Sequence, residues 1–244
     1  MKLIDAARDL SIQIHPSHEC AAFHEGDEEK TEMWYIVDCD DGAEVILGFN
    51  EEFESEKKRL DKREFRHLVE KYINEGKILD ICRRVKVHPG DMIFVEPGTI
   101  HAICGGILIA EIQQNSDTTY RVYDYGRLGA DGKPRELHIE RALDALTLAP
   151  REHLPVLDAV VPTDFGEVRL VMLGDVAASI ITLKGECSPE TELSYHIFVL
   201  EGEATLSWDG GTLSLKKSDS VLVPKALAHT IAGDAKLIVS HVVY

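Results

Sequence analysis

Short apolar segments, separated by glycine, proline or acidic residues, run along most of the 244-residue chain. The segment 10–15, LSIQIH, alternates between apolar and polar residues, and similar segments occupy 32–38, 43–49, 91–96 and 106–113. The second half repeats this rhythm in VRLVML, ASIITL, YHIFVL, ATLSW and SVLVP. A period of two places the apolar side chains on one face of a strand, and many short strands with frequent turns are typical of sandwiches and barrels. We therefore expect a mainly β fold.

Two stretches have the spacing of amphipathic helices instead. Apolar residues recur every three or four positions in 62–75, just before Gly76, and the same spacing returns in 136–146. Glycine commonly ends a helix, because it adopts the left-handed backbone conformation at little cost. We predict a helical insertion at about 56–80 and a second helix before the chain passes to its second half. The charged run 51–67 is interpreted as the solvated face of the first helix.

The chain is expected to consist of two related halves, 1–149 and 150–244. The segment 147–166, TLAPREHLPVLDAVVPTDFG, is punctuated by prolines and is interpreted as the connection between them. Moving 88–103 along by 128 positions aligns it with 216–231, with an aspartate, a valine, a histidine and an isoleucine in register. Because the strand rhythm also matches on both sides, we infer a duplicated β-barrel unit.

Charge and cysteine usage exclude several classes of protein. Lys and Arg number 26 against 43 Asp and Glu, and the formal net charge of -17 disfavours nucleic acid and anionic membrane surfaces. No apolar run approaches the roughly 18 residues needed to cross a bilayer. The five cysteines are widely spaced without a CxxC pair, which favours free thiols in a reducing compartment. We expect a soluble cytoplasmic protein that binds neither nucleic acid nor membranes.

The sharpest group of polar residues consists of Gln13, His15, Glu32 and His101. Gln13 and His15 are two positions apart on one predicted strand and therefore share a face, whereas Glu32 opens the next strand and His101 follows a Pro-Gly turn. Two imidazoles, a carboxylate and an amide oxygen suit a divalent cation such as Zn²⁺. Ordinary polar residues at a strand end would give the same pattern, so spacing alone leaves both interpretations open.

Four blocks carry a resemblance to a known family. GDMIFVEPGTIHAI has the glycine and histidine spacing of the second cupin motif, and DLSIQIHP, EKTEMWYIVD, PGTIHAI and AEIQQNSDTTYRVYDYGR resemble the type I phosphomannose isomerases. The similarity runs from Lys2 to about Leu146 and continues weakly to the end. It implies two cupin-type (jelly-roll) β-barrels, the first with the helical insertion. It also implies one Zn²⁺ per chain, bound by the four polar residues named above.

The resemblance also implies catalytic residues. It places Arg121 at the site as an electrophile that stabilises enediolate oxygens, while Lys30 suits phosphate binding or proton transfer. Asp117 and Glu111 lie in the same matched block and are candidate carboxylates for moving a proton between two carbons. A dianionic sugar phosphate needs a local positive pocket on so acidic a chain, which the metal, Lys30 and Arg121 would supply.

Each of these assignments has a structural alternative. For Arg121, the alternative is a cation at the end of a strand that pairs with Asp124. Lys30 lies within a charged run and is compatible with a solvated position. Asp117 belongs to an Asn-Ser-Asp cluster that is typical of turns.

The function implied by the resemblance is interconversion of mannose 6-phosphate and fructose 6-phosphate, by zinc-assisted proton transfer through a cis-enediol intermediate. One alternative is a non-catalytic, metal-dependent module that binds sugar phosphates. Another is a cupin oxygenase, which would require iron and consume oxygen.

The second half contains an incomplete copy of the ligand pattern in Ser194, His196, Glu201 and His229. Serine stands where the first imidazole is needed, and we therefore expect a metal-free second barrel. Members of the resembled family carry further residues before the block that begins here at Lys2. We accordingly expect an unpaired sheet edge near 10–15, self-association through that edge, and activity that has to be tested.

Overall fold

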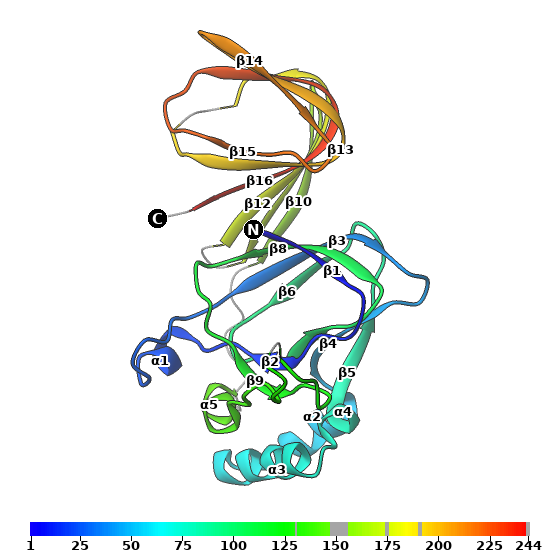
Figure 1. The fold of residues 1–244 in the computed structure, drawn as a ribbon, viewed down its shortest axis with the longest axis vertical. Helices are drawn as coiled ribbons and strands as arrows, with labels where there is room; N and C mark the ends of the chain where they lie inside the picture. The colour runs from blue at the N-terminus through cyan, green and yellow to red at the C-terminus, as the bar shows by residue number, and fades with distance from the viewer. Residues whose placement is uncertain (130, 147–155, 174–175, 190–191, 243–244) are drawn as a thin grey trace. The chain divides into compact units, whose positions relative to one another are not determined.

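The computed structural model describes five segments, 1–129, 131–146, 156–173, 176–189 and 192–242. The chain divides into two compact units, Met1–His153 and Leu154–Tyr244, which are described separately below. Strands dominate both units, so the predicted mainly β fold is confirmed (Figure 1).

The strands of the first unit form two antiparallel sheets rather than one closed barrel. The four-stranded sheet has the order β1 (Lys2–Ala6), β8 (Ile107–Gln113), β3 (Glu32–Cys39) and β6 (Met92–Val95). The five-stranded sheet has the order β5 (Cys82–Lys86), β4 (Glu44–Phe49), β7 (His101–Ile103), β2 (Ile12–Ile14) and β9 (Tyr120–Tyr123). Trp34 and Ile109 of the first sheet share a buried core with Val45 of the second, so the two sheets are packed together.

Helices cover the five-stranded sheet of this unit (Figure 1). They are α1 (His18–Ala21), α2 (Glu51–Lys57), α3 (Lys62–Asn74), α4 (Ile78–Ile81) and α5 (Ile139–Ala145). Phe53 of α2 and Phe65 of α3 pack against Phe49 of β4, with ring centroids 4.8 and 5.9 Å from that of Phe49. This aromatic contact anchors the helical insertion to the sheet, because buried aromatic pairs contribute more than their area alone.

The charged run 51–67 forms two helices, so its interpretation as one helix face is wrong. Asn50 accepts a hydrogen bond from the Phe53 amide and begins α2. Asp61 and Glu64 form a reciprocal capping box that begins α3. Each cap satisfies amides that a new helix leaves unpaired, which explains why the chain breaks between the two helices. The predicted helix at 62–75 is confirmed as α3, whereas α5 begins three residues later than the pattern in 136–146 implied.

The second unit is a single antiparallel sheet of seven strands. Its main path is β10 (Val156–Thr163), β11 (Gly166–Leu173), β12 (Val176–Cys187), β16 (His229–Val242), β13 (Tyr195–Trp208) and β14 (Gly211–Lys216), and β15 (Ser220–Val223) pairs with β13. Two predicted strands, YHIFVL and ATLSW, are halves of the continuous β13. Gly202 joins them at a φ of 72°, where a Cβ would lie 2.1 Å from the Asp234 carbonyl oxygen.

Two expectations about connections and edges need correction. The segment 147–166 is not entirely a connection, because Val156–Thr163 forms β10, while 147–155 lie outside the described residues. The strand within 10–15 is not a sheet edge, because β2 pairs with β7 on one side and β9 on the other. The edge strands of the first unit's described sheets are β1, β6, β5 and β9. Self-association itself stays a prediction.

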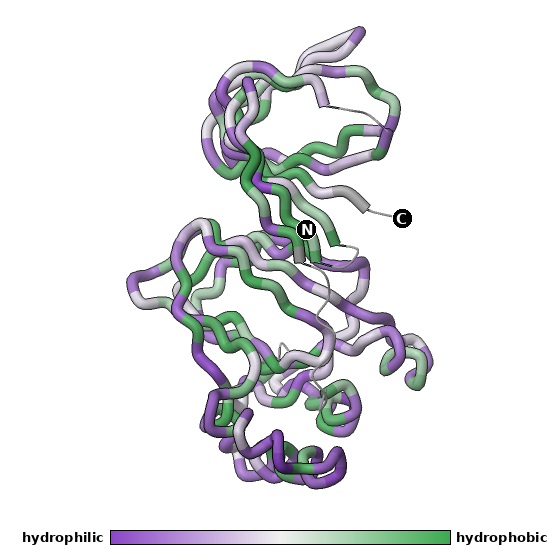
Figure 2. The backbone as a smooth tube through the Cα atoms, turned by 180° about the vertical axis from the view of Figure 1, so that it is seen from behind, coloured by the Kyte–Doolittle hydropathy of each residue, from purple (hydrophilic) through white to green (hydrophobic). Residues whose placement is uncertain are grey.

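Hydrophobic residues lie mainly along the strands of each unit, and hydrophilic residues gather on the loops and on the outer helices (Figure 2). None of the helices in the described segments is long and apolar enough to cross a bilayer. All five cysteines are free thiols, in agreement with their wide spacing.

Candidate metal centre

The five-stranded sheet aligns three polar residues on neighbouring strands. In β2, Gln13 lies opposite His101 of β7 on one side and opposite Arg121 of β9 on the other. Directly opposite residues in antiparallel strands project from the same face of a sheet. His15 is two residues beyond Gln13 and follows the same alternation. Strand pairing thus gathers residues that are about a hundred positions apart in sequence.

The four-stranded sheet contributes a buried carboxylate from β3. Glu32 has no exposed surface, and its Oε2 accepts a hydrogen bond from the Trp34 indole at 3.1 Å. Trp34 is also inaccessible to solvent and lies 5.6 Å from the His101 ring, centroid to centroid. The carboxylate is therefore held rigidly where the two sheets meet.

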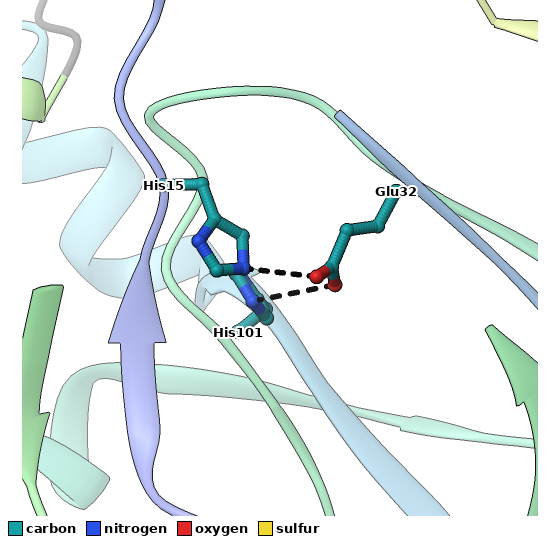
Figure 3. A group of neighbouring side chains, drawn as sticks. All are labelled: His15, Glu32 and His101. Carbon is teal, nitrogen blue, oxygen red and sulfur yellow. Dashed lines mark ion pairs between the residues drawn. The ribbon is translucent and has the colours of Figure 1, made fainter. Parts of the chain in front are cut away.

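His15, Glu32 and His101 converge on one point (Figure 3). His15 Nε2 lies 3.1 Å from Glu32 Oε1, and His101 Nε2 lies 3.9 Å from Glu32 Oε2. The other ring nitrogens are engaged by backbone carbonyls, with His15 Nδ1 2.9 Å from Thr118 O and His101 Nδ1 2.8 Å from Thr99 O. Since a carbonyl only accepts, both Nδ1 atoms carry the proton, and both Nε2 lone pairs face the carboxylate.

The electrostatics of this group favour an anionic carboxylate beside a neutral imidazole. Burial by itself raises the pKa of Glu32, but contact with His15 and the charges of His15, His101 and Lys30 outweigh it and hold the pKa well below its usual range. Burial, followed by repulsion from His15, lowers the pKa of His101 to about 3. Deprotonated donors of this kind are what a divalent cation requires.

The donor set fits a bound cation. His15 Nε2 and Glu32 Oε1 are both buried without a hydrogen bond, and of the two only Oε1 has a cation beside it, the Lys30 ammonium at 2.7 Å. Ligands about 2.1 Å from a tetrahedral Zn²⁺ lie about 3.4 Å from one another, and the two nitrogen–oxygen distances bracket that value. Buried polar atoms normally have partners, and a cation at this point would satisfy them. Within the described segments, no other group of three potential ligands of these types converges in this way.

Gln13 lies at the edge of the same group. Its amide nitrogen is 3.3 Å from His101 Nε2, and Ser11 Oγ is 3.5 Å from its amide oxygen. Rotating the amide by 180° exchanges oxygen and nitrogen and directs the oxygen toward His101 and the metal position. Gln13 is therefore placed to serve as the fourth ligand in that orientation.

Lys30 contacts the metal-ligand group directly. Its Nζ lies 2.7 Å from Glu32 Oε1, and only 4% of the residue is exposed. The alternative of a solvated charge is therefore wrong. A buried ammonium beside a carboxylate is well placed for a proton-transfer role.

Glu111 and Lys2 form a second charged pair on the four-stranded sheet. Lys2 Nζ lies 3.2 Å from Glu111 Oε1 and donates to Gln113 Oε1 at 2.8 Å. Burial, followed by repulsion from Glu32, raises the pKa of Glu111. Lys2 has no local signal in the sequence, because 2–6 lacks a regular alternation; only its place at the start of the region of family similarity marks it.

Arg121 does not pair with Asp124, contrary to the structural alternative. The Asp124 carboxylate is bound by Arg127 and Arg135. Arg121 Nη1 donates to the Glu136 carbonyl oxygen at 2.9 Å, and its Nε is buried without a hydrogen-bond partner. Burial and the neighbouring Arg135 lower the pKa of Arg121.

Asp117 is not brought into the buried group. It is exposed in the loop before β9, where its carbonyl oxygen accepts a hydrogen bond from Thr119 Oγ1 at 3.4 Å. Its carboxylate makes no hydrogen bond or ion pair with the metal-ligand residues. This position agrees with the turn interpretation.

The four candidates of the second unit do not converge. His229 Nε2 makes a short hydrogen bond with the hydroxyl of Tyr195. His196 follows Tyr195 directly in β13, so it projects from the opposite face of the sheet. The other two candidates, Ser194 and Glu201, are exposed.

Comparisons with known proteins agree with this architecture. A family model described as "Mannose-6-phosphate isomerase, cupin domain" matches residues 169–242. Mannose-6-phosphate isomerase ManA of Bacillus subtilis (strain 168) is 38% identical to this chain, over 98% of this chain and 73% of ManA. The mannose-6-phosphate isomerase of Streptococcus mutans is 32% identical, over 98% of this chain and 72% of the relative.

Solved structures give the same result for the fold. The crystal structure of the Bacillus subtilis mannose 6-phosphate isomerase matches with a TM-score of 0.85 and 35% identity, over 98% of this chain and 74% of that chain. A zinc-bound mannose 6-phosphate isomerase matches with a TM-score of 0.70 at 18% identity, over 99% of this chain and 78% of that one. The cupin fold expected from the sequence is thus confirmed, and the chain belongs to the mannose-6-phosphate isomerase family.

Proposed function

We propose that this chain is an isomerase that interconverts mannose 6-phosphate and fructose 6-phosphate through a cis-enediol intermediate. The observation that carries the proposal is the buried group in which two Nε2 lone pairs face the Glu32 carboxylate. Family membership supplies the substrate pair, and the free thiols favour a cytoplasmic location.

One Zn²⁺ per chain would be held by Gln13, His15, Glu32 and His101. When bound, it acts as a Lewis acid that polarises the sugar carbonyl. These ligands carry one formal negative charge in total, so the site keeps a net positive charge that attracts carbonyl and hydroxyl oxygens. Thr118 and Thr99 fix the ring orientations through their backbone carbonyls, which keeps the ligands preorganised.

The isomerisation moves one proton between C2 and C1 and shifts the carbonyl from one carbon to the other. Removal of the C2 proton from the aldose, with protonation of O1, gives the cis-enediol; return of a proton to C1, with loss of the O2 proton, completes the ketose. Lys30 and Glu111 are the buried groups that we assign to this transfer. The raised pKa of Glu111 favours a carboxyl that takes up and releases a proton nearer to neutral pH.

Arg121 and Lys2 are the cations assigned to anionic parts of the substrate. Arg121 lies beside Gln13 on the neighbouring strand, and a guanidinium there stabilises charge that develops on the enediol oxygens. Lys2 is half exposed at the other sheet and is suited to attract the phosphate. Asp117 remains a candidate carboxylate only if its loop moves toward the site when substrate binds.

A coupled assay of fructose 6-phosphate formation, with and without added zinc, tests the proposal. We expect zinc-dependent turnover in the parent chain and a roughly 10²–10³-fold lower kcat in Arg121→Ala, with its zinc content retained. Calorimetric binding of fructose 6-phosphate without any turnover would instead support the non-catalytic binding module. Arg63→Ala, on the exposed side of α3, serves as the matched control for loss of an arginine.

A further inference from the structure

The backbone of Arg121 forms hydrogen bonds with His138, a residue that lies outside the strands. β9 is the edge strand of its sheet, and Arg121 directs its amide and carbonyl away from β2. The Arg121 amide donates to His138 Nδ1 at 3.3 Å, and the His138 amide donates to the Arg121 carbonyl at 2.7 Å. One residue thus replaces the neighbouring strand that this edge lacks, with an imidazole nitrogen in the place of a carbonyl oxygen.

The segment 136–138, which contains His138, also binds the side chain of Arg121. The Glu136 carbonyl oxygen accepts from Arg121 Nη1, two residues before His138. His138 precedes α5, and its carbonyl accepts from the Ala142 amide in the first turn. Ala142 is fully buried in the core between helices and sheet. The segment 136–138, which binds Arg121, is therefore anchored at its C-terminal end by α5.

The hydrogen bond from the Arg121 amide to His138 Nδ1 requires a neutral His138 side chain. Nδ1 accepts only when it carries a lone pair, so the proton must be on Nε2. A second proton on the His138 ring would turn Nδ1 into a donor, and this N–H would then face the Arg121 amide N–H without an acceptor between them. Arg121 and Arg141 face the imidazole with positive charge, while Glu136 and Asp27 face it with negative charge. Burial outweighs the two carboxylates and lowers the pKa of His138.

We propose that neutral His138 is a positioning residue, which holds Arg121 beside the metal-ligand strand by accepting from its amide. The inference rests on the proposed function, because its catalytic consequence follows only if Arg121 stabilises the enediol oxygens. Its structural part, the fixed backbone of Arg121, does not depend on that function. Misplacing a catalytic group by a fraction of an ångström costs rate rather than substrate affinity.

Three variants separate positioning from mere packing. His138→Asn keeps an acceptor oxygen where Nδ1 stands but cannot titrate, whereas His138→Leu keeps bulk and removes the acceptor. His67→Asn, on the exposed face of α3, is the matched control. We expect His138→Leu to lower kcat about tenfold at neutral pH with KM and zinc content nearly unchanged, and His138→Asn to restore most of the loss.

The pH profile gives a second readout. As pH falls below the ordinary imidazole pKa of 6.5 and through the lowered pKa of folded His138, the parent enzyme gains a proton on this ring. We therefore expect the parent and His67→Asn to lose kcat in this acid range more steeply than His138→Asn. Identical acid limbs in the parent and His138→Asn would remove the titratable part of the inference.

Hydrogen exchange of the Arg121 amide tests the contact without any assay of turnover. Exchange should be at least about tenfold faster in His138→Leu than in the parent, and slow again in His138→Asn. Unchanged exchange and unchanged kcat in His138→Leu would overturn the inference. If the parent chain shows no isomerase activity, the proposed function fails, while the exchange experiment still decides whether His138 holds Arg121.

Discussion

His101 in the first unit and His229 in the second have the same backbone partner but different partners in the core. Each ring lies with Nδ1 close to the carbonyl oxygen two residues earlier, at 2.8 Å from Thr99 O and 2.7 Å from Leu227 O. Nε2 of His101 faces Glu32, whereas Nε2 of His229 accepts from the Tyr195 hydroxyl. The same imidazole orientation therefore occurs in the candidate metal centre of one unit and in a hydrogen bond to a tyrosine in the other.

The turns that precede these histidines are also equivalent. Asp91 accepts from the amide three residues earlier, at 2.8 Å from His88 N, and Asp219 accepts from Lys216 N at 2.9 Å. In the first unit the strand opposite is irregular just after Ile36, and in the second just after Val199. This agreement supports the inference of a duplicated unit.

In the second unit, two residues that are not glycine have backbone conformations that favour glycine. Gly90 and Gly98 have φ values of 94° and 79°, and the aligned Ser218 and Ala226 have 74° and 65°. A side chain in this region costs about 1 kcal/mol or more. In the described part of the second unit, these turn conformations are thus present without the glycines and without a converging group of three potential metal ligands.

The largest expected difference between the two units appears when His101 and His229 are each replaced by alanine. His101→Ala deletes a ligand, and we expect loss of the bound metal and at least about a 10²-fold fall in kcat. His229→Ala should leave both unchanged apart from a stability cost. Elemental analysis and the coupled assay measure the two effects; equal metal loss in both variants would refute the assignment of one centre.

Acid should destabilise the metal-free first unit through His101. Its pKa is about 3 in the folded chain against an ordinary 6.5, so the unfolded chain binds the extra proton between these values. Stability is therefore present above pH 6.5 and is lost as pH falls toward 3, by about 2 kcal/mol at pH 5. Urea unfolding after chelation measures this loss, and His101→Asn should flatten it.

The Tyr195 hydroxyl provides a test within the second unit. Tyr195→Phe leaves His229 Nε2 buried without a donor, which should cost about 1–3 kcal/mol. Tyr123→Phe is the matched control, since that hydroxyl makes no hydrogen bond in the described structure. Calorimetry of both variants decides the point, and equal melting temperatures would mean that the Tyr195 hydrogen bond adds nothing to stability.

Exchanging residues between the aligned turns gives the smallest expected effect. Ser218→Gly should raise, and Gly90→Ser lower, the free energy of unfolding by about 0.5–1 kcal/mol. A Cβ at Gly90 meets no atom within 4 Å, so its cost is purely torsional. Denaturant titrations check both signs; a stabilising Gly90→Ser would show that the positive φ carries no strain.

Periodicity predicted the elements that have a clean pattern. The helical spacing of 62–75 predicted α3, and the short, mainly apolar segment 106–113 predicted β8. The short strands β1, β5 and β9 were missed, because four or five residues do not establish a period. Strand β10 was missed because its Pro162 and the two prolines before it indicated a connection, although an edge strand accommodates proline.

The candidate site was predictable in part. Gln13 and His15 were placed on one face by alternation alone, but the approach of Glu32 and His101 depends on which strands pair, which local patterns do not specify. Lys2 and His138 were not identified, since their roles arise from neighbours that are distant in sequence. Asp117 was selected by resemblance, whereas the structure leaves it in an exposed loop.

The pairing of β2 also has a consequence for how the chain is synthesised. Gln13 pairs with His101 and Arg121, which follow it by about a hundred residues. At about 5–20 residues per second, a ribosome needs roughly 5–20 s to produce both partners after residues 12–14 have emerged. During that interval β2 has no paired strands. Pairings between strands that are distant in sequence also form slowly. Formation of the five-stranded sheet around β2 therefore depends on residues that are synthesised late in this unit.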